Sequence, residues 1–386
     1  MTVDTITTHF EYHAIDANLL KLDILGHDDP TMIRRLEKLT NTNVQTDVPF
    51  DDKNVMSLFL GPEALGITSD DIDGCPTGSL GLPELGTDFV IQMLVDTKPT
   101  KIADLVRLAG LSHGTDVWLG NAQTLIQEGK CTISTAICTR DDIMVYLMDK
   151  GIEPQVSFDI MEHVRKGRGL LTFTDKETGE DRKEEDVMRE HNVPEWYIWS
   201  CKKIKYMFPK AHAAAYIMMA LRVAWYKVYH PLAYYAAYFG IRAKAFDYET
   251  MCQGKEKLEY FMADLKRKKN NHEASKKDED SLGDMKIVQE MYARGFEFVP
   301  IDIYKAKARS FQIIDGKIMP SFKVISKVGE SAGESIEIAA RDGEFLSKDD
   351  LRQRAKIGQT VIEKLGELGL LDGMAESNQL SLFDVI

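Results

Sequence analysis

The pattern of apolar and polar positions predicts a chain that is mainly helical. From about residue 51 to 246, helical segments alternate with turns rich in glycine and proline. Short β-like runs follow between residues 296 and 322, and short helices return between 324 and 373. In the central part, helices are predicted at 87–95, 101–109, 115–128, 140–150, 154–165, 185–191, 194–206 and 211–229.

The N-terminal region has a different pattern, which predicts one strand followed by a helix. Leu20, Leu22 and Ile24 alternate with Lys21 and Asp23, and Gly26 ends the run. A helix then begins at about residue 30, next to a proline. A strand Asp flanked by apolar residues either lies at an exposed edge or holds a metal ion, and a lone one is more often structural.

Charge is distributed unevenly along the 386 residues. The net charge of −13 argues against binding to nucleic acid. Between Glu195 and Asp247, however, the sequence contains no carboxylate. A polyanion could dock on this segment, or it could be a buried apolar helix without room for acids, as the run 213–220 suggests in part. The cations of the segment are Lys202, Lys203, Lys205, Lys210, Arg222, Lys227, Arg242 and Lys244.

Several classes of protein can be set aside. No run of eighteen apolar residues is present, and the first residues lack the pattern of a signal peptide, so we expect no membrane association and a cytoplasmic location. The five cysteines are scattered without a C-x-x-C pair, which disfavours a disulfide scaffold and a zinc site. Asp70, Asp71 and Asp73 resemble half of a calcium loop but lack the required glutamate, so we expect them to be solvated. The charged run at 266–280 predicts a solvated linker or exposed turn.

Two basic segments could bind phosphate. The segment 165–169 contains three cations and two glycines at a predicted helix end, which suits triphosphate oxygens or merely complements the helix dipole. In the segment 208–216, Lys210, His212 and Tyr216 lie one turn apart or less and could share one face. They would then form a phosphate donor set with a stacking ring. The alternative is close packing of helices with an incidental histidine.

Five blocks of sequence resemble a known family. They are 19–31, 78–87, 110–118, 201–216 and 379–383. Together they are similar to the C-terminal part of the bacterial DNA polymerase III alpha subunit of the PolC type, and the similarity extends through nearly the whole chain.

The resemblance implies a replicative DNA-directed DNA polymerase, which transfers deoxynucleotides from dNTP to a primer 3′-OH with two Mg²⁺ ions. Asp23 matches the third of three palm carboxylates that bind these ions. The motif carrying the other two is not found here, so the chain is expected to be a fragment beginning inside the palm and inactive alone. Residues matched to the incoming-nucleotide pocket are Arg165, Lys166, Phe208, Lys210, His212 and Tyr216.

Two further elements follow from the resemblance. The segment 325–336 is similar to a helix-hairpin-helix, in which Lys327, Gly329 and Ser331 would meet a DNA phosphate. Lys327 replaces the usual first glycine and Gly333 the usual alanine, while Glu330 and Glu334 add negative charge. The hairpin is therefore degenerate. The tail resembles a sliding-clamp-binding peptide, although an apolar patch packed on the domain would also fit it. Its residues are Gln379, Leu380, Ser381, Leu382 and Phe383.

The expected architecture is a mainly α, multidomain chain with a small α/β palm remnant. Its expected regions are the palm portion 1–50, the helical fingers 51–246, a duplex-binding region 247–373 and a flexible clamp-binding tail 374–386. Expected partners are primer-template DNA, dNTP, the sliding clamp and other replisome subunits. The alternative function is a non-catalytic module that binds DNA and the clamp.

Overall fold

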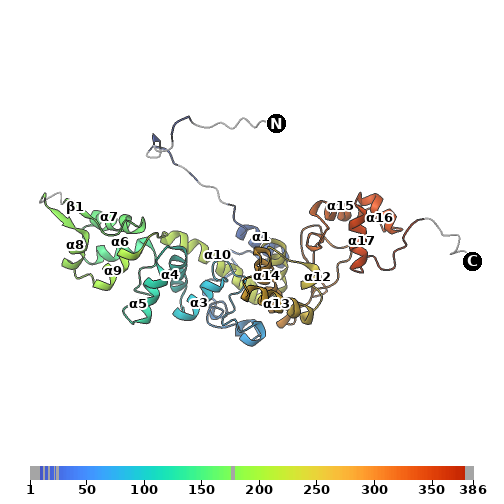
Figure 1. The fold of residues 1–386 in the computed structure, drawn as a ribbon, viewed down its shortest axis with the longest axis horizontal. Coiled ribbons are helices and arrows are strands. Elements are labelled where there is room, and N and C mark those ends of the chain that lie inside the picture. Colours follow the sequence, from blue (N-terminus) through green and yellow to red (C-terminus); the bar gives the residue numbers. More distant parts are fainter. Residues whose placement is uncertain are drawn as a thin grey trace, which may run out of the picture.

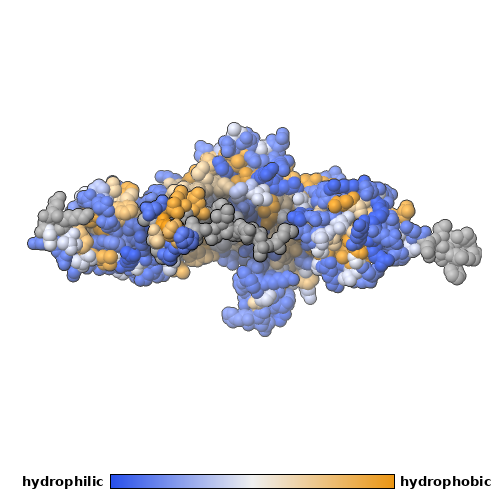
Figure 2. Space-filling view, turned by 90° about the horizontal axis from the view of Figure 1, so that it is seen from above, coloured by the Kyte–Doolittle hydropathy of each residue, from blue (hydrophilic) through white to orange (hydrophobic). Residues whose placement is uncertain are grey.

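The computed structural model describes residues 9–11, 14–15, 18–20, 22, 26–174 and 179–378. The predicted strand around Asp23 therefore lies largely outside the described residues. The helices form an elongated row, in which β1 and α6 to α9 occupy one end and α15 to α17 the other (Figure 1). On the surface, hydrophilic residues surround smaller hydrophobic groups (Figure 2). No helix among the residues described is both long and apolar enough to cross a membrane.

The mainly helical class is confirmed. The helices in the first half are α1 (Asp29–Thr40), α2 (Lys53–Ser57), α3 (Asp88–Thr97), α4 (Ile102–His113), α5 (Gln123–Gln127), α6 (Arg140–Asp149), α7 (Pro154–Arg165), α8 (Glu184–Glu190) and α9 (Glu195–Lys203). Those in the second half are α10 (Lys210–Tyr229), α11 (Pro231–Ile241), α12 (Tyr248–Met251), α13 (Lys255–Asn270), α14 (Lys276–Ala293), α15 (Glu330–Ala340), α16 (Lys348–Ala355) and α17 (Gln359–Glu367).

Two antiparallel strand pairs complete the described fold. The first joins β1 (Thr172–Thr174) to β2 (Asp181–Lys183), and the second joins β3 (Gln312–Ile314) to β4 (Lys317–Met319). The second pair confirms the β-like runs expected between 296 and 322.

Helix α10 is the central packing element. It packs against α4, α11, α2, α1 and α6, and Ala213, Ile217, Ala220, Leu221 and Ala224 are buried along it. Alanine leaves room for close approach of neighbouring helices, while each fully buried Ile or Leu contributes roughly 1.5–3 kcal/mol. The buried-helix interpretation of this segment is therefore correct for one side of α10.

A buried ion pair joins α10 to distant parts of the chain. Lys227 and Glu290 are both fully buried, with Lys227 Nζ 2.8 Å from Glu290 Oε2. The same ammonium donates to the carbonyl oxygens of Gly78 and Leu80, at 2.8 and 2.6 Å. The Tyr235 hydroxyl donates to Glu290 Oε1 at 2.7 Å. Because every charged atom has a partner, this cluster fixes α10, α11, α14 and the loop at 78–80 together.

The acid-free segment is partly neutralised by carboxylates from elsewhere in the fold. Lys202 pairs with Glu185 of α8, and Arg242 pairs with Asp29 of α1. Together with the Lys227 pair, these contacts remove much of the positive charge that the sequence suggested. The segment is consequently not one continuous basic surface.

Two predicted elements need correction. The helix expected at 115–128 is broken, because Leu119 is extended and Gly120 is left-handed with φ of +65°, and Lys203 Nζ donates to the Gly120 carbonyl at 2.8 Å. Of the two interpretations of the charged run 266–280, the exposed turn holds, but only for a short part of it. Its first part ends α13 and its last part begins α14, so only 271–275 form the turn.

Candidate functional site

A row of aromatic rings lies along one side of the start of α10. Phe208, His212 and Tyr216 are spaced four residues apart, and the ring centroids are separated by 4.8 Å and then 4.5 Å. One helical turn takes 3.6 residues, so this spacing keeps the rings on one face. The Tyr216 hydroxyl lies 2.8 Å from His27 Nε2, which places the segment before α1 at the far end of the row.

His113, at the end of α4, supports the row from the side. Its ring meets Phe208 and His212 edge-on, with centroid distances of 5.6 and 5.8 Å. Its Nε2 lies 2.7 Å from Glu84 Oε2, and its Nδ1 lies 2.7 Å from the Ala109 carbonyl oxygen. Both acceptors require an N–H, so this geometry selects the doubly protonated, positively charged ring.

The contacts among His113, Glu84 and His212 set the protonation states of these side chains. The hydrogen bond to Glu84 raises the pKa of His113 above its ordinary value. The same bond lowers the pKa of Glu84. Burial, followed by repulsion from His113, lowers the pKa of His212, so this ring is neutral near pH 7. The row therefore presents neutral π faces beside one fixed cation.

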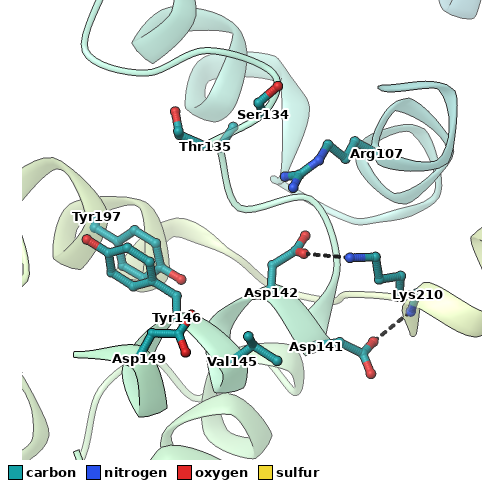
Figure 3. A pocket seen from close by; sticks show the side chains of 11 residues that line it. Arg107, Ser134, Thr135, Asp141, Asp142, Val145, Tyr146, Asp149, Tyr197 and Lys210 are labelled. Atoms are coloured by element: carbon teal, nitrogen blue, oxygen red, sulfur yellow. Dashed lines mark hydrogen bonds and ion pairs between the residues drawn. The ribbon is translucent and has the colours of Figure 1, made fainter. Parts of the chain in front are cut away.

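Lys210 does not share the face of the ring row. Its backbone N–H donates to Asp141 Oδ2 at 2.6 Å, and its Nζ lies 3.6 Å from Asp142 Oδ1. Both carboxylates belong to the first turn of α6 and line a cavity of about 310 Å³ with Lys210 (Figure 3). Two residues along a helix correspond to about 200° of rotation, which explains the separation from His212. The expectation of a shared face for Lys210, His212 and Tyr216 is therefore wrong.

The backbone of Arg165 and Lys166 packs against the segment just before the ring row. The Met207 N–H donates to the Arg165 carbonyl oxygen at 3.3 Å. At Gly167, φ is +71° and an added Cβ would lie 2.5 Å from the Lys205 carbonyl oxygen, so the close approach requires glycine.

The two basic side chains themselves are paired within their own helix. Glu162 contacts both, with Arg165 Nη2 at 2.8 Å and Lys166 Nζ at 2.9 Å. These bonds, Arg165 first, lower the pKa of Glu162 to about 2. A triphosphate would have to compete with this carboxylate.

The region expected to form the helix-hairpin-helix has an exposed turn before α15. Lys327 adopts φ of +65°, the left-handed conformation that explains a glycine preference at this position. Lys327, Gly329 and Ser331 are exposed, while Val328 is buried. Glu330 and Glu334 both contact Arg309, so a single guanidinium offsets only part of the negative charge that the two carboxylates add.

The remaining predicted site residues lie outside the described residues. These are Asp23 and the tail residues Gln379 to Phe383. Within the stretch 374–386 that is expected to be flexible, the described residues form hydrogen bonds to the start of α16. The Lys348 N–H donates to the Ala375 carbonyl oxygen at 2.8 Å, and the Ser347 hydroxyl donates to Asn378 Oδ1 at 2.6 Å. Among the residues described, no group of three or more His, Cys, Asp or Glu is placed to hold a metal ion.

Sequence reasoning missed His113 and Glu84 as parts of the site. Each lies inside a block of family resemblance, His113 in 110–118 and Glu84 in 78–87, but the two are 29 positions apart in the sequence. Glu84 is held in a left-handed turn with φ of +62°, a conformation that no periodic pattern reveals. The nearby Ser79–Gly86 turn and the end of α4 meet only through tertiary packing.

Comparison with known proteins defines the class to which this fold belongs. The family model "Bacterial DNA polymerase III alpha subunit finger domain" matches residues 29–184, and the model "Helix-hairpin-helix motif" matches residues 295–380. Both matches fit a segment of a bacterial DNA polymerase III alpha subunit.

Similar proteins give the particular type. The chain is 53% identical over 384 residues to the PolC-type DNA polymerase III of Streptococcus pyogenes serotype M2 (strain MGAS10270). It is 52% identical to that of Streptococcus suis (strain 98HAH33). Both similarities cover the whole chain, which spans 26% of the length of each relative. Over its whole length, the chain is thus homologous to PolC-type DNA polymerase III.

Proposed function

We propose that this chain forms the incoming-nucleotide pocket and part of the duplex grip of a replicative DNA polymerase. The reaction is template-directed transfer of deoxynucleotides from dNTP to a primer 3′-OH. The observation that carries the proposal is the row of Phe208, His212 and Tyr216, supported by a charged His113. Rings in such a row can stack on any base, since every base has a π face.

The phosphates of the nucleotide are assigned to the basic groups around this row. Arg165 and Lys166 are close enough to exchange Glu162 for a triphosphate, because their backbone borders the 205–208 segment. Guanidinium groups bind phosphate oxygens in a bidentate manner. Lys210 would approach the phosphates from the α6 side, where Asp141 and Asp142 now hold it.

Magnesium enters the proposal through Asp23, the residue proposed to bind it. DNA polymerases generally use Mg²⁺, which stabilises the attacking and leaving oxygens when two ions are bound. A polypeptide of residues 1–386 alone is proposed to be inactive, because one such carboxylate cannot hold two ions. A primer-extension assay tests this, and extension that survives contaminant controls would contradict it.

The C-terminal region is proposed to bind duplex DNA and a sliding clamp. The exposed turn at Lys327, Gly329 and Ser331 would bind a phosphate without reading bases. Gln379 to Phe383 would occupy the clamp groove, which connects the polymerase to the other replisome subunits.

Photo-crosslinking tests the position of the nucleotide. A complete PolC-type polymerase carrying this segment is incubated with primer-template and a 5-halogenated deoxyuridine triphosphate, irradiated and digested for mass spectrometry. The expected crosslinked peptide contains residues between 208 and 216. A crosslink on the α6 peptide 140–149 instead would place the base in the cavity around Lys210 and overturn the proposed pocket.

A further inference from the structure

A second cavity lies where α1, the end of α11 and the segment before β3 meet. Its volume is about 370 Å³. Arg35 Nη2 donates to the Phe311 carbonyl oxygen at 2.8 Å, which joins α1 to the C-terminal region at this point. The cavity is lined by Thr31, Arg34, Arg35, Lys38, Ala236, Ala237, Gly240, Ile241, Arg309, Ser310 and Phe311.

The lining of this cavity is basic and contains no carboxylate, although the chain as a whole carries a charge of −13. Arg34 and Lys38 are exposed and lie one turn apart on α1. Neither makes an ion pair or side-chain hydrogen bond within the part of the chain that the structure describes. They are thus available to an anion.

Arg35 adds a second argument for an anion. Its side chain is half-buried, and its described polar contact is the Phe311 carbonyl rather than a carboxylate. A guanidinium withdrawn from water without a counter-ion is unfavourable for folding. An incoming phosphate would compensate this charge and form bidentate hydrogen bonds with it.

The cavity continues toward the hairpin. Arg309 and Ser310 line it and also line a neighbouring pocket of about 410 Å³ beside α15. Arg309 is in turn bound by Glu330 and Glu334 in the first turns of α15. The basic face of α1 and the exposed turn before α15 therefore border one stretch of surface.

We propose that this cavity and the adjoining face of α1 bind successive backbone phosphates of the same DNA duplex that the hairpin grips. The inference rests on the proposed duplex-binding function and adds Arg34, Arg35 and Lys38 to it. Arg34 and Lys38 are roughly 6 Å apart along the helix axis, so they follow a strand rather than converge on one group. The only aromatic ring in the lining, Phe311, is fully buried, so no base can stack there. Backbone contact without base readout is the chemistry that remains.

Duplex binding by the 386-residue chain tests the proposal. Fluorescence anisotropy with a labelled 24-base-pair duplex is measured from low to moderate salt for the parent and for the double variant Arg34→Ala/Lys38→Ala. We expect about tenfold weaker binding and a salt dependence reduced by about two, because each phosphate contact contributes close to one to the slope. The matched control is Lys130→Ala/Lys277→Ala, which removes the same charge from exposed positions outside the cavity.

The other outcomes are decisive as well. Parent-like binding by the cavity variant, with weaker binding by Lys327→Gly at the hairpin, would overturn the inference and leave the duplex-binding function intact. Equal weakening by the control variant would show a general charge effect and also overturn it. A variant that loses binding of inorganic pyrophosphate but not of duplex would identify a free-phosphate site instead.

A parent chain that binds no duplex would refute the proposed duplex-binding function, and this inference with it. Melting temperatures of both variants should match the parent, which excludes unfolding as a cause.

Discussion

The positive charge of His113 depends on two acceptors held in place by the fold. Glu84 and the Ala109 carbonyl fix both ring nitrogens, and the ring edge then supports Phe208 and His212. The cation also opposes protonation of His212. A neutral His212 is compatible with a stacked base, whereas a second cation beside His113 would be repelled.

Substitution of Glu84 tests this charge. Glu84→Gln should lower the His113 pKa, because the neutral amide no longer stabilises the imidazolium, and NMR titration of the ring measures it. The pKa of His113 is raised above 6.5 by folding, so its contribution is complete below pH 6.5 and disappears as pH rises through the folded-state pKa. The pKa of Glu84 is lowered, so its contribution is lost as pH falls toward acid values.

The loss of stability in Glu84→Gln should consequently be larger at pH 6 than at pH 9. Since both side chains are partly exposed, at 28% and 21%, the difference is expected to be only about 1 kcal/mol. Thermal unfolding at the two pH values measures it. An unchanged His113 pKa, or a larger loss at pH 9, would contradict the assignment of a charged ring.

Side-chain positions were only partly predictable from the sequence. The spacing of Phe208, His212 and Tyr216 is enough to align them, because one turn separates neighbours. The predicted shared face for Lys210 is wrong because residues two positions apart on a helix lie on nearly opposite sides. The pairing of His113 with Glu84 depends on a turn and a helix end that meet only in the folded chain.

At the level of elements, the hairpin region owes its packing to a glycine inside a helix. A Cβ on Gly333 of α15 would lie 2.9 Å from Phe322 Cβ. The usual alanine of this motif therefore does not fit here without movement of the segment before α15. The observed glycine brings the helix close to Phe322, which is fully buried.

Two matched glycine substitutions test this packing. Gly333→Ala should destabilise the chain by about 1–3 kcal/mol, because overpacking outweighs the gain in helix propensity. Gly283→Ala in α14 is the control, since its Cβ would meet no atom within 4 Å. It should stabilise by about 0.5–1 kcal/mol. Thermal unfolding checks both, and equal effects of the two substitutions would contradict the packing described here.

Helical elements were largely predictable because apolar periodicity reports the buried face. The exceptions have local causes. The break at Gly120 follows from its left-handed conformation, and the two helices around 271–275 were missed because their charged ends look like a linker. Charge at helix ends is compatible with helix, since basic residues favour the C-terminus and acids the N-terminus.

For the whole molecule, only the folded structure shows which basic side chains have carboxylate partners. Carboxylates from α1, α8 and α14 neutralise Arg242, Lys202 and Lys227 of the acid-free segment. Arg34, Arg35 and Lys38, which line a cavity without a carboxylate, lie instead on α1, which the sequence did not single out. Net charge and linear charge windows therefore could not locate the surface proposed for DNA.

The proposed clamp-binding tail provides a test at the scale of the whole molecule, because the predicted effect is on binding to a partner and not on the stability of the core. Replacing Leu382 and Phe383 with alanine should abolish binding to a sliding clamp, since burial of two such side chains supplies most of a roughly micromolar affinity. The melting temperature should remain almost unchanged. Titration and thermal unfolding measure the two effects. A variant that loses stability, or that still binds the clamp, would show that these residues pack on the domain instead.

Nucleotide kinetics of Tyr216 variants test the assignment of the ring row most directly. In a complete PolC-type polymerase carrying this segment, Tyr216→Ala should raise the apparent KM for dNTP about tenfold and alter nucleotide selection, because base stacking is lost. Tyr216→Phe keeps the ring and should retain selection. Lys210→Ala should raise KM for every nucleotide alike, since it would meet phosphate rather than base. If Tyr216→Ala and Lys210→Ala leave nucleotide kinetics unchanged while both lower the melting temperature, the start of α10 is structural and is not the nucleotide pocket.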